Sequence, residues 1–140
     1  MGKMKNPKFI TLVLFATIAL TRCDKTTDPQ VDSQFVSTYS VTETWTENGK
    51  AMSKPAFSMT IVPSTQHDDV MLLNNFANYG AGITVEGTIS GNTLTIAQQT
   101  LSNSITVSGS GTLLIPILTI TYTEVINGNS IVVNATATKI

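Results

Sequence analysis

Apolar residues alternate with threonine and serine along most of the chain after residue 35. Between residues 38 and 46, for example, Tyr39, Val41 and Trp45 lie at odd positions, and hydroxyl-bearing residues fill the even ones. A period of two places successive side chains on opposite faces of a β-strand, so one face is apolar and the other polar. Threonine, valine and isoleucine also fit the pleated surface of a sheet. The pattern predicts an all-β domain.

The alternating runs predict eight strands, at about residues 36–46, 56–63, 69–76, 82–90, 93–100, 104–112, 115–126 and 130–139. The dipeptides Asn48-Gly49, Gly91-Asn92 and Asn127-Gly128 lie between runs and tolerate the positive φ of tight hairpins. Connections this short join antiparallel strands. Eight sequential strands with one apolar face are expected to close into an up-and-down barrel, which leaves no exposed edge. The alternative is a two-sheet β-sandwich.

A different pattern precedes the domain. Lys3, Lys5 and Lys8 are followed by an uncharged apolar run over residues 9–20. Twelve residues rise about 18 Å as a helix, well short of the ~30 Å that spans a bilayer. A basic start and a short apolar run predict that residues 1–22 are a secretory signal peptide, with a buried N-terminal helix as the alternative.

The single cysteine follows this run directly. The segment Leu20-Thr21-Arg22-Cys23 resembles a bacterial lipobox, although Arg22 replaces the usual small residue, which bears on the efficiency of cleavage. We therefore expect Cys23 to be lipidated, the polar residues 23–34 to be a lipid-anchored tether, and residues 35–140 to form the domain. The expected location is the cell envelope, as an outer-membrane lipoprotein. The alternative is a secreted protein with a free thiol.

Charge and composition exclude several partners. After residue 22 the chain has four lysines, no arginine and nine acidic residues, a formal charge of −5. A nucleic-acid-binding surface needs a basic patch, which is missing here. An acidic surface has no attraction for anionic lipid headgroups, so membrane attachment would depend on the acyl chains of Cys23. A single cysteine excludes a disulfide scaffold. We expect the protein to be a monomer.

Four segments carry a resemblance to a known family. They are Phe35–Tyr39 (FVSTY), Asn74–Gly80 (NNFANYG), Val85–Ile96 (VEGTISGNTLTI) and Ser108–Leu113 (SGSGTL). Together with the lipobox and tether, they resemble the calycin-like (lipocalin-like) lipoproteins of Bacteroidetes. The resemblance implies a lipid-anchored calycin-like barrel and says little about function.

Lipocalins have a Gly-x-Trp signature on the first strand and an arginine near the last. Here Glu43 stands where the glycine would be, and no arginine follows Arg22. The resemblance therefore does not by itself imply lipocalin ligand binding. Lys139 is a candidate to take the place of the arginine and cover Trp45.

Two carboxylates mark a candidate ligand site. Glu43 shares the phase of Trp45, and Glu124 that of Tyr122, so strict alternation points all four side chains into the barrel. A carboxylate there must be hydrogen-bonded or neutralised. The more ordinary outcome is a β-bulge or frayed strand end that turns Glu43 outward. If both carboxylates point inward, they flank a polar pocket.

Two aromatic residues in the segment over residues 74–80 form a second candidate site. Phe76 and Tyr79 lie among asparagines and glycine, as in a surface loop that presents aromatic faces to a sugar or a protein partner. The alternative is a structural corner whose aromatic side chains cap one end of the barrel.

Catalysis is not expected from the available residues. The only histidine lies in His67-Asp68-Asp69, where three adjacent residues cannot converge on one metal ion, so we expect an exposed loop tip and neither metal nor cofactor. Ser110, between two glycines, lacks the strand-to-helix setting of a nucleophile and is expected to mark a bulge or tight bend. We expect a binding protein for a small apolar or amphipathic ligand. The alternative is a surface module that recognises protein or glycan and holds no internal ligand.

Overall fold

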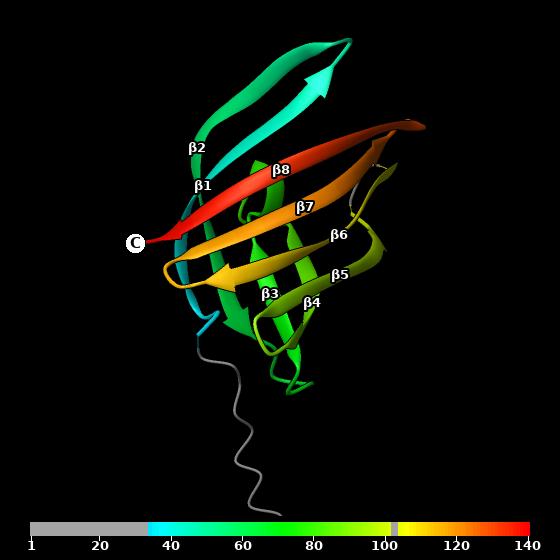
Figure 1. Ribbon diagram of the computed structural model, residues 1–140. Coiled ribbons are helices and arrows are strands. Elements are labelled where there is room, and N and C mark those ends of the chain that lie inside the picture. The colour runs from blue at the N-terminus through cyan, green and yellow to red at the C-terminus, as the bar shows by residue number, and fades with distance from the viewer. Residues whose placement is uncertain (1–33, 102–103) are drawn as a thin grey trace, which may run out of the picture.

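The eight strands of the computed structural model pair in chain order, and the last pairs with the first (Figure 1). The structure describes residues 34–101 and 104–140. All pairs are antiparallel. The elements are β1 (Ser37–Glu47), β2 (Lys50–Pro63), β3 (Val70–Asn74), the 3₁₀ turn η1 (Phe76–Asn78), β4 (Thr84–Ser90), β5 (Thr93–Thr100), β6 (Ile105–Leu114), β7 (Ile117–Ile126) and β8 (Asn129–Lys139).

The expected all-β fold and closed up-and-down barrel are confirmed, and the two-sheet sandwich is wrong. Closure depends on the pairing of β1 with β8, from Tyr39 opposite Lys139 to Trp45 opposite Val133. Every strand therefore has two neighbours within residues 37–139, and the barrel closes without residues 1–33. The predicted signal peptide, the predicted lipidation site Cys23 and the predicted tether up to residue 33 lie outside the described residues.

The alternation of the sequence becomes an alternation of burial. In β4, Val85, Gly87 and Ile89 are buried and the four residues between and beside them are exposed. The same alternation runs along β7 and β8. Fully burying one aliphatic or aromatic side chain of this size contributes about 1.5–3 kcal/mol, so the barrel interior is the main source of stability.

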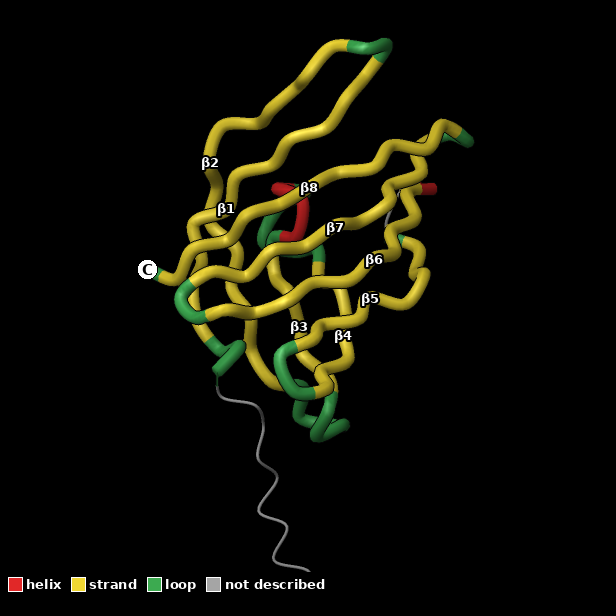
Figure 2. Tube along the Cα trace, in the orientation of Figure 1, coloured by secondary structure: helices red, strands yellow, loops and turns green. Residues whose placement is uncertain are grey.

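The two ends of the barrel have different connections between strands, which Figure 2 shows as green turns and red helical turns. We call the end with the turns at residues 64–69, 91–92 and 115–116 the packed end. There Phe35 is fully buried, and the Tyr39 hydroxyl donates a hydrogen bond to the Phe35 carbonyl oxygen over 2.9 Å. We call the end with the turns at residues 48–49 and 127–128 and with η1 the mouth.

The barrel is less regular at the mouth. The pairing of β1 with β8 stops at Trp45 and Val133, although β1 continues to Glu47 and β8 begins at Asn129. Beyond this point the β1–β2 hairpin leans away from the end of β8 (Figure 1). Within the described ranges, no helix is long and apolar enough to cross a membrane.

Candidate functional site

Glu43 points into the barrel and is only 2% exposed. The expectation that a β-bulge or a frayed strand end turns it outward is wrong. A register shift does occur between Val41 and Glu43, but the extra residue lies on β2, since Phe57 and Lys54 are the partners of these two residues. Glu43 therefore keeps the inward phase of Tyr39 and Val41.

The bulge on β2 places a lysine opposite this carboxylate. Phe57, Met59 and Ile61 mark the inward phase of β2, and strict alternation from them would turn Lys54 outward. Because Pro55 and Ala56 together take the space of one residue, Lys54 instead becomes the partner of Glu43. Proline lacks a backbone N–H and is tolerated in sheets at such bulges.

Two side chains contact the Glu43 carboxylate, one at each oxygen. Lys54 Nζ lies 3.2 Å from Oε2 in an ion pair whose angles fall short of a hydrogen bond. The Tyr122 hydroxyl donates a hydrogen bond to Oε1 over 2.8 Å. Burial, and then the negative charge of Glu43 that accepts this bond, raise the pKa of Tyr122, so the phenol remains a donor. A buried carboxylate needs such partners because desolvation strongly disfavours an unpaired charge.

The side chain of Tyr122 reaches Glu43 from β7, and the residues on either side of Tyr122 leave space for it. Gly109 is its partner on β6, and a Cβ at Gly109 would lie 2.6 Å from Tyr122 Cβ and 2.5 Å from the Thr121 carbonyl oxygen. The glycines around Ser110 thus allow close approach of β7, and the β6–β7 register continues past them without a bulge. On its other side the Tyr122 ring contacts Phe76, with ring centroids 4.8 Å apart.

The expected surface display of Phe76 is wrong, because this ring is 1% exposed inside the mouth. Asn75, Ala77 and Asn78 adopt positive φ of 60°, 54° and 60°, which folds η1 back into the barrel. Asparagine tolerates this conformation better than most residues. Tyr79 is half-buried beside η1, so the alternative in which the two aromatic side chains cap one barrel end is the better description.

Lys54 also joins the aromatic side chains of the mouth. Its Nζ donates a hydrogen bond to the Ala77 carbonyl oxygen over 3.1 Å and lies 5.9 Å from the ring centroid of Trp45 and 5.7 Å from that of Tyr79. The interpretation that Lys139 covers Trp45 is wrong. Lys139 lies at the packed end, where it contacts the ring of Tyr39.

Glu124 is the second buried carboxylate, at 5% exposure. Its Oε1 atom has no hydrogen-bond partner among the described residues. Burial raises the pKa of Glu124, Lys54 acts in the opposite direction, and Glu43 adds a further increase. Lys54 therefore influences two inward-facing carboxylates and forms its ion pair with Glu43.

A cavity of about 310 Å³ lies in the mouth beside Glu124. Its polar lining comes from Glu47, Lys54 and Glu124, and its apolar lining from Trp45, Tyr79, Ile126, Ile131 and Val133. Of the four predicted ligand residues, Trp45 and Glu124 line this cavity. Glu43 and Tyr122 do not line it, and Glu43 is linked to it by its ion pair with Lys54. Such a cavity combines an apolar surface with a few polar groups, as small-molecule sites commonly do.

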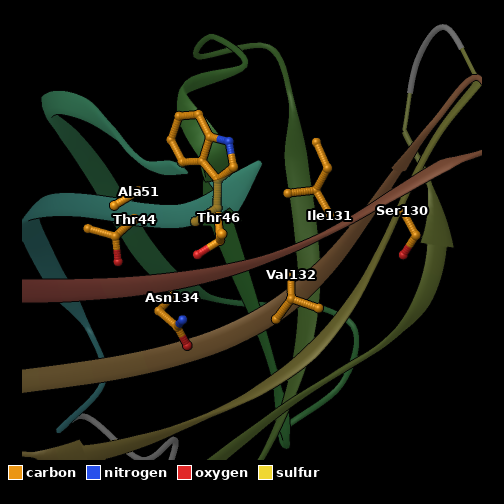
Figure 3. A pocket seen from close by; sticks show the side chains of 8 residues that line it. Thr44, Thr46, Ala51, Ser130, Ile131, Val132 and Asn134 are labelled. Carbon is orange, nitrogen blue, oxygen red and sulfur yellow. The ribbon is translucent and has the colours of Figure 1, made fainter. Parts of the chain in front are cut away.

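A second hollow lies on the outer surface where β1 and β8 separate (Figure 3). Its volume is about 470 Å³. Thr44 and Ala51 lie on one side and Val132 and Ser130 on the other, which gives it a more polar lining than the mouth cavity has. Ile131 borders both hollows, as does Trp45, so these two side chains lie between the cavity and the outer surface.

The remaining candidate residues are not brought to this site. His67, Asp68 and Asp69 are exposed in the β2–β3 connection at the packed end, as expected. In the described part of the chain, no group of three histidine, cysteine, aspartate or glutamate side chains is arranged to hold a metal ion. Ser110 is exposed on the outer face of β6.

The sequence did not indicate Lys54 as a site residue, nor the lining residues Glu47, Ile126, Ile131 and Val133. The predicted second strand began at residue 56, whereas β2 begins at Lys50. Pro55 was the available signal, because a proline inside an alternating run indicates an edge or a bulge.

Comparison of the sequence with models of protein families gives no match, and comparison with curated proteins gives none either.

Proposed function

We propose that this chain is a lipid-anchored protein of the cell envelope that binds a small amphipathic molecule in the mouth cavity. The observation that carries the proposal is the cavity itself, with an apolar wall and the incompletely paired carboxyl group of Glu124. A buried polar atom without a partner costs free energy, and a ligand that supplies the partner recovers it.

The packing of the rest of the interior limits the size of the ligand. Tyr39, Met59, Leu73 and Phe76 are almost completely buried and fill the barrel below the mouth. A cavity of about 310 Å³ is at the lower limit of typical ligand pockets, which measure roughly 300–1,000 Å³. The expected ligand therefore has a short apolar body and one polar end.

The position of the cavity is compatible with an anchor at Cys23. The chain enters the barrel at the packed end, and β1 leads from there to the mouth. Val36, Leu114, Ile115, Ile117 and Ile140 are exposed apolar side chains near the packed end. With the packed end toward the membrane, the mouth would open away from the lipid surface, toward solutes of the envelope.

Native mass spectrometry of residues 24–140, purified from cell extract, tests for a bound ligand. We expect adducts that survive gentle ionisation and disappear on denaturation. A titration with Nile red, an uncharged apolar dye, gives a second readout. The single tryptophan of the chain, Trp45, lines the cavity, so its emission should change on binding.

A matched pair of variants locates the binding. Ile126→Phe adds a ring inside the mouth cavity and should weaken Nile red binding, whereas Val132→Phe adds the same ring outside it. A clean apo mass together with no uptake of the dye would refute the proposal. The alternative, a surface module that recognises protein or glycan, would then be the better description.

A further inference from the structure

We propose that the mouth cavity selects amphipathic amines, with the ligand's ammonium group beside Glu124, and disfavours carboxylates of the same length. The inference depends on the proposed function, because it concerns the ligand class of the same cavity. It rests on the number of charged groups around the cavity and on the partners that each of them already has.

Acidic groups outnumber basic ones around the mouth. Strand β1 contributes Glu43 and Glu47, β2 contributes Lys54 and, opposite Glu47, Lys50, and β7 contributes Glu124. From η1 and β8, the described residues that line the cavity contribute no carboxylate, lysine, arginine or histidine. Three carboxyl groups therefore outnumber two ammonium groups, and only Lys54 of the two lines the cavity, so a further cation is attracted to the cavity more strongly than an anion.

The lysine that lines the cavity is already committed to other partners. Lys54 makes its ion pair with Glu43 at 3.2 Å and donates a hydrogen bond to the Ala77 carbonyl oxygen at 3.1 Å. A carboxylate ligand would have to share this lysine with Glu43 and would also lie near Glu124. Like charges in one partly desolvated site repel each other, so a fatty-acid head group fits this cavity poorly.

Glu124 provides the unused acceptor. It lines the cavity, is 5% exposed, and has an Oε1 atom without a hydrogen-bond partner in the described residues. An ammonium group supplies three N–H donors and the opposite charge. Its charge would also favour the ionised form of Glu124, whose pKa burial otherwise raises. The rings of Trp45 and Tyr79 add surfaces that attract a cation.

The test compares octylamine, octanol and octanoate, three ligands with the same chain length and different head-group charge. Residues 24–140 contain all eight strands and the whole core, and Trp45 emission at pH 7 reports binding. We expect octylamine to bind at least about tenfold more tightly than octanoate, a difference of about 1.4 kcal/mol, with octanol between them.

Two substitutions of the same type distinguish the site from the overall charge. Glu124→Gln should bring the affinities for octylamine and octanoate to within about threefold of each other, because it removes the buried charge and little volume. Glu86→Gln changes the net charge equally on the exposed face of β4 and should keep the preference for the amine. Equal binding of octanoate and octylamine, or a preference that survives Glu124→Gln, would overturn the inference while the cavity remains a binding site. Absence of binding by all three ligands would reject the proposed function as well.

Discussion

The hydrogen bond from Tyr122 to Glu43 provides the sharpest test of how the mouth is stabilised. Tyr122→Phe removes the hydroxyl and keeps the ring that contacts Phe76. The barrel contains a matched control, because Tyr39 is equally buried and also donates a single hydrogen bond, to the Phe35 carbonyl oxygen. The two tyrosines differ in the charge of the acceptor, which is a carboxylate in one case and a neutral amide in the other.

The expected magnitudes follow from that difference. A hydrogen bond to a charged group contributes about 1.5–3 kcal/mol, and a neutral one about 1 kcal/mol. We therefore expect Tyr122→Phe to lower the free energy of unfolding by about 2 kcal/mol and Tyr39→Phe by about 1 kcal/mol. The larger loss reflects a buried carboxylate that keeps Lys54 as its remaining partner.

Urea unfolding, followed by circular dichroism, measures both losses. With an m-value of about 1–3 kcal/mol/M, a difference of 1 kcal/mol separates the two midpoints by about 0.3–1 M. A double-mutant cycle with Glu43→Gln would then isolate the contribution of the carboxylate charge. If Tyr39→Phe costs as much as Tyr122→Phe, the reasoning that the charge of Glu43 strengthens this bond is refuted.

Three further outcomes are expected from the same assay. Lys54→Met leaves Glu43 buried without its cation and should lower the free energy of unfolding by about 3 kcal/mol. Combining Lys54→Met with Glu43→Gln should recover most of this loss, and a double variant as unstable as the single one would contradict the ion-pair argument. The raised pKa of Glu124 means that the folded protein binds this proton more tightly than the unfolded chain does. The protonated carboxyl group therefore contributes to the free energy of unfolding at acid pH, and this contribution is lost as the pH rises through the pKa of the folded state. Glu124→Gln should therefore have a larger free energy of unfolding than the original chain at pH 7, and the difference should shrink as the pH falls toward the ordinary glutamate pKa of about 4.3. A difference that grows on acidification would contradict the raised pKa. Gly109→Ala places a Cβ 2.5 Å from the backbone of the neighbouring strand and should cost about 1–3 kcal/mol, and a loss below about 0.5 kcal/mol would mean that the strands separate easily.

Much of the barrel could be predicted because its signals are local. The alternation in Thr84–Ser90 predicted the strand and its buried face, and Asn127-Gly128 predicted the hairpin between the last two strands. Each signal depends on neighbouring residues alone, namely the period of a strand and the positive φ of a turn. The strand count and the antiparallel order follow from them.

The candidate site was predicted less well because it depends on irregular backbone. Lys54 was missed, since the bulge at Pro55 and Ala56 reverses the phase of β2 at that point. Surface display of Phe76 and a cap on one barrel end were both open, since asparagine and glycine indicate a loop without saying which way the loop folds, and the buried Phe76 fits the cap. On β2 a shift of one residue exchanges the buried and exposed faces, whereas at Phe76 the positive φ of Asn75, Ala77 and Asn78 decides the direction of the turn.

The sequence by itself determined that this chain forms alternating strands, joined by tight turns, around an apolar interior. Only the tertiary structure decided that Glu43 and Tyr122, which are 79 residues apart, would meet inside the barrel, with Lys54 beside them and Glu124 at the cavity. The physical reason is the range of the forces involved. Alternation and turn geometry act between neighbours in the chain, whereas closure of β8 onto β1, the register of β2 and the inward fold of η1 depend on strands that are distant in sequence.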